Sequence, residues 1–221
     1  MMHVWKRLID LLILKLKGYL VIDNFFPDEI CDHLRSVALN NKQVDFHWNG
    51  YVARDFDKGT ATNVGRIMVD NSELGPIGIH EGDSLKEIAD RYVFSKVSFI
   101  RKESYIRSWS FLYDNKADGV GPHIDPGSYY TINTWVTPDQ CVEDKSKNGL
   151  RIYRKKYDKI NFGGIVNRES MKGVKYDVIP YRYNRCVIFR GNTIHETDYV
   201  SMKTGHKNKR ISYTFLYDKG S

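Results

Sequence analysis

The end of the chain carries the pattern that most limits its fold. From Lys209 to Tyr217 polar and apolar side chains alternate with a period of two, which is typical of a β-strand with one buried face. The two faces divide cleanly into a polar set and an apolar set: Arg210, Ser212 and Thr214 against Ile211, Tyr213 and Phe215. A guanidinium and two hydroxyls on one strand face can bind a carboxylate. The strand therefore predicts an anion-binding face inside a sheet.

Short strand patterns fill the second half of the chain. They fall at 97–101, 105–113, 129–136, 149–154, 174–179, 185–190 and 209–217, separated by Gly, Asn, Asp and Pro. An earlier strand is expected at 18–22, followed by helices at 27–39 and 84–94. Helices followed by many short strands predict a mainly β (α+β) fold. We expect a double-stranded β-helix, the jelly-roll or cupin-like barrel, with N-terminal helices packed on one face.

The length of 221 residues fits a single domain. Within it, we expect residues 1–95 to form a helical N-terminal support and residues 96–221 to form the jelly-roll core. Residues 41–82 are rich in turn formers, and the connection 155–173 is rich in Lys, Gly and Asn. A connection of that length favours an insertion or a mobile lid. We expect the loops at about 45–82 and 155–173 to form the substrate side of the barrel.

Composition narrows the setting in which the chain works. Its three cysteines are far apart and lack a Cys-x-x-Cys pattern, which indicates free thiols in a reducing compartment. The apolar stretch 5–16 is interrupted by charges and is too short to span a membrane. We therefore expect a cytoplasmic protein without a membrane partner. The net charge of +7 leaves an acidic partner open, including a nucleic acid, although no nucleic-acid-binding motif accompanies the basic clusters.

A His-x-Asp triplet stands at positions 123–125. Glycines and a proline precede it and Pro126-Gly127 follows it, so the triplet is expected where a strand gives way to a loop. Residues i and i+2 of an extended chain point the same way, so His123 and Asp125 can reach one ion. His195 follows the apolar run 186–189, which predicts a buried strand ending at Gly191-Asn192.

Such a triplet is common by chance, so the prediction depends on order and placement. The ligand types His123, Asp125 and His195 are each expected at a strand end, with Arg210 beyond the last of them. Two imidazoles and one carboxylate can occupy one face of an iron(II) ion and leave the other open. A nearby arginine can then hold an anionic co-substrate beside the metal.

In this order, the residues resemble the iron(II)/2-oxoglutarate-dependent dioxygenases, nearest the prolyl-4-hydroxylase-like branch. The similarity covers 105–217, and the segment 21–27 is also similar. The resemblance implies that His123, Asp125 and His195 ligate the metal. It further implies which residues bind 2-oxoglutarate, with the distal carboxylate on the first of them: Arg210, Ser212, Tyr113 and Thr214.

The same resemblance implies an enzyme, an oxidoreductase that uses Fe(II), 2-oxoglutarate and dioxygen, with ascorbate as a supporting reductant. Its substrate would be a peptide or a small molecule, and a peptidyl proline, a free amino acid and a modified base all stay open. Asp125 is retained where halogenating relatives carry a small residue, which favours hydroxylation. Asn133 and Trp135 have inward parity on the next strand and can line the pocket, with core packing as the simpler role for Trp135.

The sequence departs from the family at three places. Asn148-Gly149 keeps only one glycine of the usual pair, and the basic loop Ser201–Lys209 is longer than is typical. The last strand lacks the Asn and second Arg of the nucleic-acid-demethylating branch. Two alternatives to the enzyme stay open. One is a non-catalytic cupin-like protein that binds a metal or ligand, and the other is a basic nucleic-acid-binding module.

Overall fold

A computed structural model describes residues 2–40, 64–69, 85–97, 99–101, 104–113, 116–117, 119–125, 127–156 and 166–219. Most of the regular structure is antiparallel sheet. The larger sheet has six strands in the order β1-β8-β5-β11-β3-β2. Their bounds are β1 Tyr19–Ile22, β2 Val64–Val69, β3 Tyr105–Tyr113, β5 Tyr130–Trp135, β8 Cys186–Arg190 and β11 Arg210–Tyr217. Every neighbouring pair in this sheet is antiparallel.

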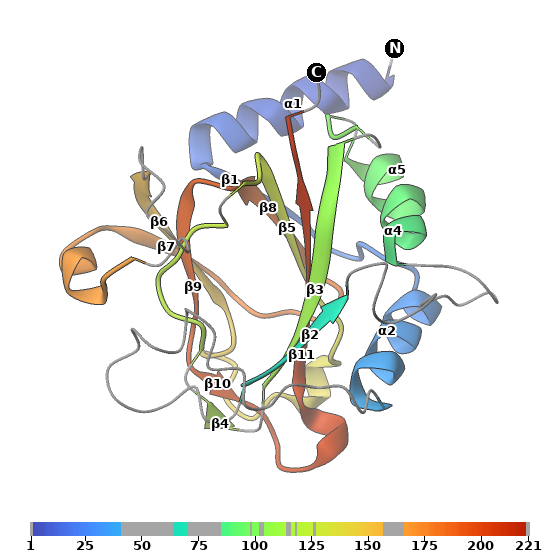
Figure 1. Cartoon of the computed structure of the whole chain (residues 1–221), viewed down its shortest axis with the longest axis vertical. Helices are drawn as coiled ribbons and strands as arrows, with labels where there is room; N and C mark the ends of the chain where they lie inside the picture. Colours follow the sequence, from blue (N-terminus) through green and yellow to red (C-terminus); the bar gives the residue numbers. More distant parts are fainter. Residues whose placement is uncertain are drawn as a thin grey trace.

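A smaller sheet lies against the larger one (Figure 1). Its three strands have the order β7-β6-β9 and are also antiparallel. Their bounds are β6 Leu150–Lys156, β7 Tyr176–Ile179 and β9 Thr193–Thr197, and a separate two-stranded pair is formed by β4 Lys116–Ala117 and β10 Val200–Ser201. Apolar side chains of both sheets meet between them, and those with almost no exposure are Trp135, Leu150, Ile152, Ile179, Val187 and Phe189.

Helices cover the outer face of the larger sheet. They are α1 Met2–Lys17, α2 Asp28–Asn40 and a continuous helical segment made of α4 Leu85–Ile88, the π-turn η1 Ala89–Val93 and α5 Phe94–Lys96. In Figure 1, α2 and the α4–α5 segment lie together on one side, and α1 crosses one end of the sheet. Their buried apolar residues share one core with the outward side chains of β11: Ile211, Tyr213, Phe215 and Tyr217. Short 3₁₀ turns occur at η3 Asp139–Cys141, η4 Arg168–Met171 and η5 His206–Asn208.

The fold class predicted from the sequence is confirmed: the chain is mainly β, with the jelly-roll arrangement and N-terminal helices on one face. The alternation of β11 explains why both layers form. Its apolar side chains face the helices, and the Tyr213 hydroxyl donates a hydrogen bond to the carbonyl of Leu34 in α2 (2.8 Å). Its polar side chains face the smaller sheet.

One predicted strand is wrong. The stretch 97–101 forms no strand in its described residues and instead turns directly after α5. The amide of Val97 donates to the carbonyl of Val93, and the amide of Ile100 donates to the carbonyl of Val97. Val97, Phe99 and Ile100 are buried in the helix-facing core. The apolar residues of this stretch are buried, as their composition predicted, but they belong to a turn and not to a strand.

Other elements differ from the sequence expectation. The stretch 5–16, given no secondary structure above, lies in helix α1, and β2 lies within the segment expected to be rich in turns. β6 continues to Lys156, and η4 follows at 168–171. Most of the predicted substrate loops, namely residues 45–63, 70–82 and 157–165, lie outside the described residues. No helix in the described ranges combines the length and apolar character needed to cross a membrane.

The contact between α2 and the sheet makes a stability prediction. Leu34 is fully buried in the core beneath β11. Leu34→Ala should lower the free energy of unfolding by about 2–5 kcal/mol, because it leaves a cavity between helix and sheet. Denaturant unfolding followed by circular dichroism measures the change. Asp32→Ala, on the exposed side of the same helix, should change stability by less than about 0.5 kcal/mol. Equal effects of the two substitutions would contradict this packing.

Candidate metal centre

His123 and His195 are joined by one antiparallel backbone bridge. The amide of each histidine donates to the carbonyl of the other, both at 2.9 Å. Paired residues on adjacent antiparallel strands project to the same side, and the two imidazole rings lie 4.1 Å apart between centroids. Asp125 follows on the same extended segment, where its amide donates to the carbonyl of Gly191.

One atom from each of His123, Asp125 and His195 lies within 4.8 Å of the others, so the three can hold a metal ion. The Nε2 atoms of His123 and His195 lie 4.0 Å and 3.6 Å from the two carboxylate oxygens of Asp125. Asp125 and His195 are buried, and His123 is partly exposed. The sequence placed His195 after a strand end, whereas it lies in the middle of β9, because the Gly191-Asn192 turn is short and a new strand begins at Thr193.

Backbone carbonyls orient both histidine rings. His123 Nδ1 contacts the Gly121 carbonyl oxygen at 2.6 Å, and His195 Nδ1 contacts the Thr193 carbonyl oxygen at 3.1 Å. A carbonyl only accepts, so each Nδ1 carries the proton and each Nε2 presents a lone pair toward Asp125. Burial lowers the pKa of His195 to about 4, with His123 as a second cause. His195 is therefore neutral near pH 7, as a metal ligand must be.

Asp125 is held by a side chain of the neighbouring strand. The Thr131 hydroxyl in β5 donates to Asp125 Oδ2 at 2.7 Å, and both residues are buried. This bond fixes the carboxylate and leaves its other oxygen toward His123. Gly119 permits the close approach of this segment to β9, since a Cβ there would overlap the carbonyl oxygen of Thr197.

Arg210 lies at the start of β11, buried within a cage of three aromatic rings. Its guanidinium carbon is 4.9 Å from the Tyr113 ring centroid, 5.4 Å from that of Trp135 and 5.7 Å from that of Tyr181. Its Nε donates to the carbonyl of Asn148 at 3.0 Å, but its Nη1 is buried and has no hydrogen-bond partner among the described residues. Burial lowers the pKa of this guanidinium below its usual range.

A buried cation with a free donor is costly unless an anion completes it. No carboxylate in the described part of the chain forms an ion pair with Arg210, although Asp198 contributes to its electrostatic environment. Two further buried atoms without partners belong to inward residues of β5: Nε1 of Trp135 and Oδ1 of Asn133. The interior face thus offers a guanidinium and other polar atoms to a ligand with an anionic end.

The remaining predicted co-substrate residues lie on the same interior face with different partners. Tyr113 faces Arg210 across β3 and β11, and its hydroxyl lies 3.3 Å from that of Thr197. Burial raises the pKa of Tyr113, so it is a neutral hydrogen-bond donor. Ser212 is buried and paired in register with Trp135. Thr214 accepts a hydrogen bond from Nδ2 of Asn133 (2.9 Å), which leaves it less free for a ligand than Ser212.

Three contributors escaped the sequence analysis in whole or in part. Thr131 and Tyr181 carried no local signal, because their roles depend on strand pairing and on the chain reversal after β7. The sequence has asparagine at position 148, where the family usually has a glycine, and the backbone conformation of Asn148 explains why asparagine fits there. It has φ 70°, in the left-handed region that asparagine tolerates better than most residues. Its side chain bonds to the backbone of Asp144 and Ser201, and its carbonyl holds Arg210.

The outer side of β9 is fixed by a buried ion-pair cluster. Glu196, next to His195, accepts hydrogen bonds from Arg151 (3.0 Å) and from the Tyr153 hydroxyl (2.7 Å). Arg151 also pairs with Asp198. Burial and Glu196 together raise the pKa of Tyr153. The strand that carries His195 is therefore anchored on the face opposite the centre, and the positive charge of Arg151 is neutralised within the fold.

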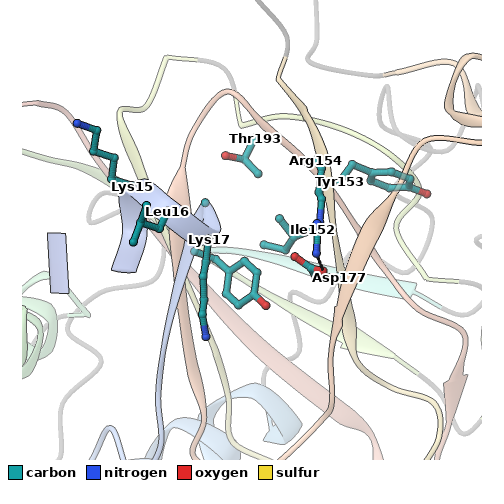
Figure 2. Close-up of a pocket in the computed structure, with 10 residues that line it drawn as sticks. Lys15, Leu16, Lys17, Ile152, Tyr153, Arg154, Asp177 and Thr193 are labelled. Carbon is teal, nitrogen blue, oxygen red and sulfur yellow. Dashed lines mark hydrogen bonds and ion pairs between the residues drawn. The ribbon is translucent and has the colours of Figure 1, made fainter. Parts of the chain in front are cut away.

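A cavity of about 390 Å³ lies between the end of α1 and strands β1, β6, β7 and β9. Figure 2 shows Ile152 and Thr193 among the residues that line it, together with the ion pair of Arg154 with Asp177 (2.7 Å). Ile152 pairs in register with His195, and Thr193 supplies the carbonyl that orients the His195 ring. The Thr193 hydroxyl is buried and unpartnered among the described residues.

No family model matches the chain, and no curated protein is similar to it in sequence. Solved structures are similar. A prolyl hydroxylase from Trichoplax adhaerens in complex with a hypoxia inducible factor peptide fragment has 15% identity, with a TM-score of 0.60 over 99% of this chain and 92% of that one. The chain has the fold of the iron(II)/2-oxoglutarate oxygenases.

Two other solved structures support this fold. HygX from Streptomyces hygroscopicus, solved with nickel and 2-oxoglutarate bound, has 11% identity and a TM-score of 0.58 over 95% of this chain and 85% of that one. SnoK, an alpha-ketoglutarate-dependent carbocyclase from nogalamycin biosynthesis, has 12% identity and a TM-score of 0.64 over 96% and 86%. Proteins of this fold that are named for different reactions are thus similar to the chain. Sequence identities of 11–15% show the fold and not the reaction.

The hydrogen bond to Asp125 yields a prediction for metal affinity. Thr131→Val keeps the shape of the side chain and removes the donor, so the carboxylate loses its orientation. Iron(II) affinity, measured by anaerobic calorimetry, should fall about 10–100-fold. Thr134→Val is the matched control, because this buried threonine of the same strand has an unpartnered hydroxyl. Unchanged affinity in Thr131→Val, or an equal loss in both variants, would contradict the role given to Thr131.

Proposed function

We propose that the protein is an iron(II)/2-oxoglutarate-dependent dioxygenase that hydroxylates its substrate. The observation that carries the proposal is one barrel interior with two complementary halves. His123, Asp125 and His195 converge at one end, and Arg210 lies buried with an unpartnered Nη1 at another. A metal ion accounts for the first group and a dicarboxylate co-substrate for the second.

The donor set fits a non-haem iron(II) ion. Two imidazole nitrogens and one carboxylate oxygen match the facial triad of such iron sites, which leaves positions open for other ligands. The Nε2 atoms are aimed together because carbonyl oxygens hold both Nδ1 protons. Asp125, kept in place by Thr131, supplies the single negative charge. We propose these three residues as the metal ligands.

The inward-facing side chains of β11 fit 2-oxoglutarate. Arg210 would bind the distal carboxylate through its free Nη1, since a charge-assisted bond satisfies a donor that the fold leaves unpaired. Tyr113 and Ser212 lie on the same face and would add hydrogen bonds. Thr214, already bonded to Asn133, is proposed to position the pocket wall.

When bound, iron(II) and 2-oxoglutarate would supply oxidising power from dioxygen, with ascorbate keeping the metal reduced. The chain's own residues would hold geometry and exclude water. Trp135, Val187 and Phe189 have almost no exposure and form apolar walls beside the centre. The Phe189 ring lies 4.5 Å from that of His195. This apolar contact would shield the proposed metal ligand His195 from solvent.

The substrate is proposed as a peptidyl proline or a small molecule. A peptide occupies the similar prolyl hydroxylase, whereas SnoK is named for a carbocyclisation. Hydroxylation is the outcome we favour, because Asp125 keeps the carboxylate ligand. All three cysteines are free and buried, which supports the proposal of a cytoplasmic protein. We also propose that 1–95 and 96–221 act as one catalytic domain, since β1 and β2 pair within the larger sheet.

The ligand assignment predicts loss of turnover. His123→Ala and Asp125→Ala should each abolish iron(II) binding and the conversion of 2-oxoglutarate to succinate, because each removes a donor from a three-donor set. Succinate release with iron(II), ascorbate and oxygen measures activity, and wild-type protein that binds the metal without releasing succinate would favour a non-catalytic cupin-like protein. Full activity of either variant would disprove the assignment. Salt-dependent DNA binding without cofactors would instead favour the nucleic-acid-binding alternative.

The role of Arg210 predicts a separate effect. Arg210→Met should raise the dissociation constant for 2-oxoglutarate at least about tenfold, because the distal carboxylate loses a charge-assisted partner. Iron(II) affinity should change little, as Arg210 is not among the converging ligands. Arg190→Met is the control, since Arg190 stacks on Tyr129 and Tyr130 instead. Unaltered 2-oxoglutarate binding in Arg210→Met would refute the anchor.

A further inference from the structure

Helix α1 exposes an unbroken apolar stripe. Its large apolar side chains are between half and three quarters exposed: Trp5 64%, Leu8 53%, Ile9 54%, Leu12 55% and Leu16 75%. Positions spaced three and four apart lie on one side of a helix, so these five form one continuous surface. They are the largest group of exposed large hydrophobic residues in the described part of the chain.

The opposite side of α1 is already packed against the protein. Leu14 is buried in the helix-facing core, with Leu11 and Ile13 packed against it. Asp10 is buried and pairs with Lys6, whose ammonium also donates to the carbonyl of Lys96 in α5. The helix is therefore fixed to the fold by one face, and the exposed stripe is not required for that attachment.

The charges around the stripe are all positive. Arg7, Lys15 and Lys17 are exposed, and Asp10 is the single acidic residue between positions 2 and 17. Since Asp10 is buried and paired, no carboxylate of α1 faces the solvent beside the stripe. Such a helix, with tryptophan and leucine on one side, Lys15 beside them and further exposed cations elsewhere on its surface, has the features of one that lies in the interface of a membrane. The net charge of +7 acts in the same direction.

We propose that α1 attaches the protein to the surface of a membrane that contains anionic lipid. The apolar stripe enters the interface between headgroups and acyl chains, and the flanking cations pair with acidic headgroups. Contact between two copies through this face would bring lysines against lysines without an acidic partner, so the charges favour lipid over self-association. From the sequence we expected no membrane partner, because the apolar stretch is too short to span a bilayer. Attachment at the surface departs from that expectation and does not require spanning.

The position of the stripe gives the attachment a consequence for the barrel. Leu16 ends the stripe, and Lys15, Leu16 and Lys17 border the cavity of Figure 2. The two lysine side chains extend outward from that cavity in Figure 2. A bilayer that covers the stripe would therefore lie at the rim of a cavity whose inner wall includes Thr193, two residues from His195.

Vesicle cosedimentation of the full chain tests the proposal without metal or co-substrate, so its outcome is independent of the proposed enzymatic function. Wild-type protein should sediment with vesicles of equal parts phosphatidylcholine and phosphatidylserine, and much less with phosphatidylcholine alone. Leu8→Gln/Leu12→Gln should weaken binding at least about tenfold, because two leucine side chains leave the interface. Lys15→Gln/Lys17→Gln should weaken it several-fold and reduce its dependence on salt.

The matched control is Ile106→Thr/Val178→Thr, which removes two exposed apolar residues outside α1 and should leave binding unchanged. Circular dichroism checks that each variant is folded, and a blue shift of tryptophan emission on vesicle addition should vanish in Trp5→Phe. Absence of wild-type binding to acidic vesicles, or full binding by the leucine variant, overturns the proposal. So does undiminished binding by the lysine variant, as would a dimer in light scattering that the leucine substitutions dissociate without any vesicle binding.

Discussion

The bridge between His123 and His195 is the constraint on which the candidate site depends. Two reciprocal backbone hydrogen bonds set the separation of the rings before any side chain is considered. Everything nearby preserves that bridge. Gly119 lets the strands approach, Thr131 fixes Asp125 beside them, and Glu196 anchors the outer side of β9. A site built on paired strands is more rigid than one built on loops alone.

The sequence predicted which side chains share one face of the candidate site, because strand parity is a local property. The alternation of β11 put Arg210 and Ser212 on one face and Ile211 and Tyr213 on the other, and the structure has them so. The same parity brought His123 and Asp125 to one side of their segment. Their roles as ligands stay a prediction, while their convergence with His195 is a feature of the structure.

What the sequence could not predict depends on contacts between distant segments. Tyr181 joins the Arg210 cage only because the chain reverses after β7, and Thr131 reaches Asp125 only once β5 lies beside the His-x-Asp segment. The stretch 97–101 was apolar enough for a strand, yet the backbone turns there because α5 ends just before it. Helix α1 was not predicted because apolar residues lie on both its exposed and its packed side. The alternation of buried apolar and exposed polar positions that marks a surface helix is therefore absent.

The burial of Arg210 in its aromatic cage costs stability, and this cost is understandable if Arg210 has the binding role proposed for it. A buried guanidinium with an unpaired Nη1 lowers the free energy of unfolding relative to an apolar side chain of similar volume. Selection for stability alone would therefore disfavour Arg210, and the proposed co-substrate would supply the missing partner of its guanidinium. Under the proposed function, the protein should gain thermal resistance when a dicarboxylate binds, by an amount that grows with the logarithm of ligand concentration above the dissociation constant. The free energy of unfolding of this protein would then depend on the concentration of the proposed co-substrate as well as on the contacts within the fold.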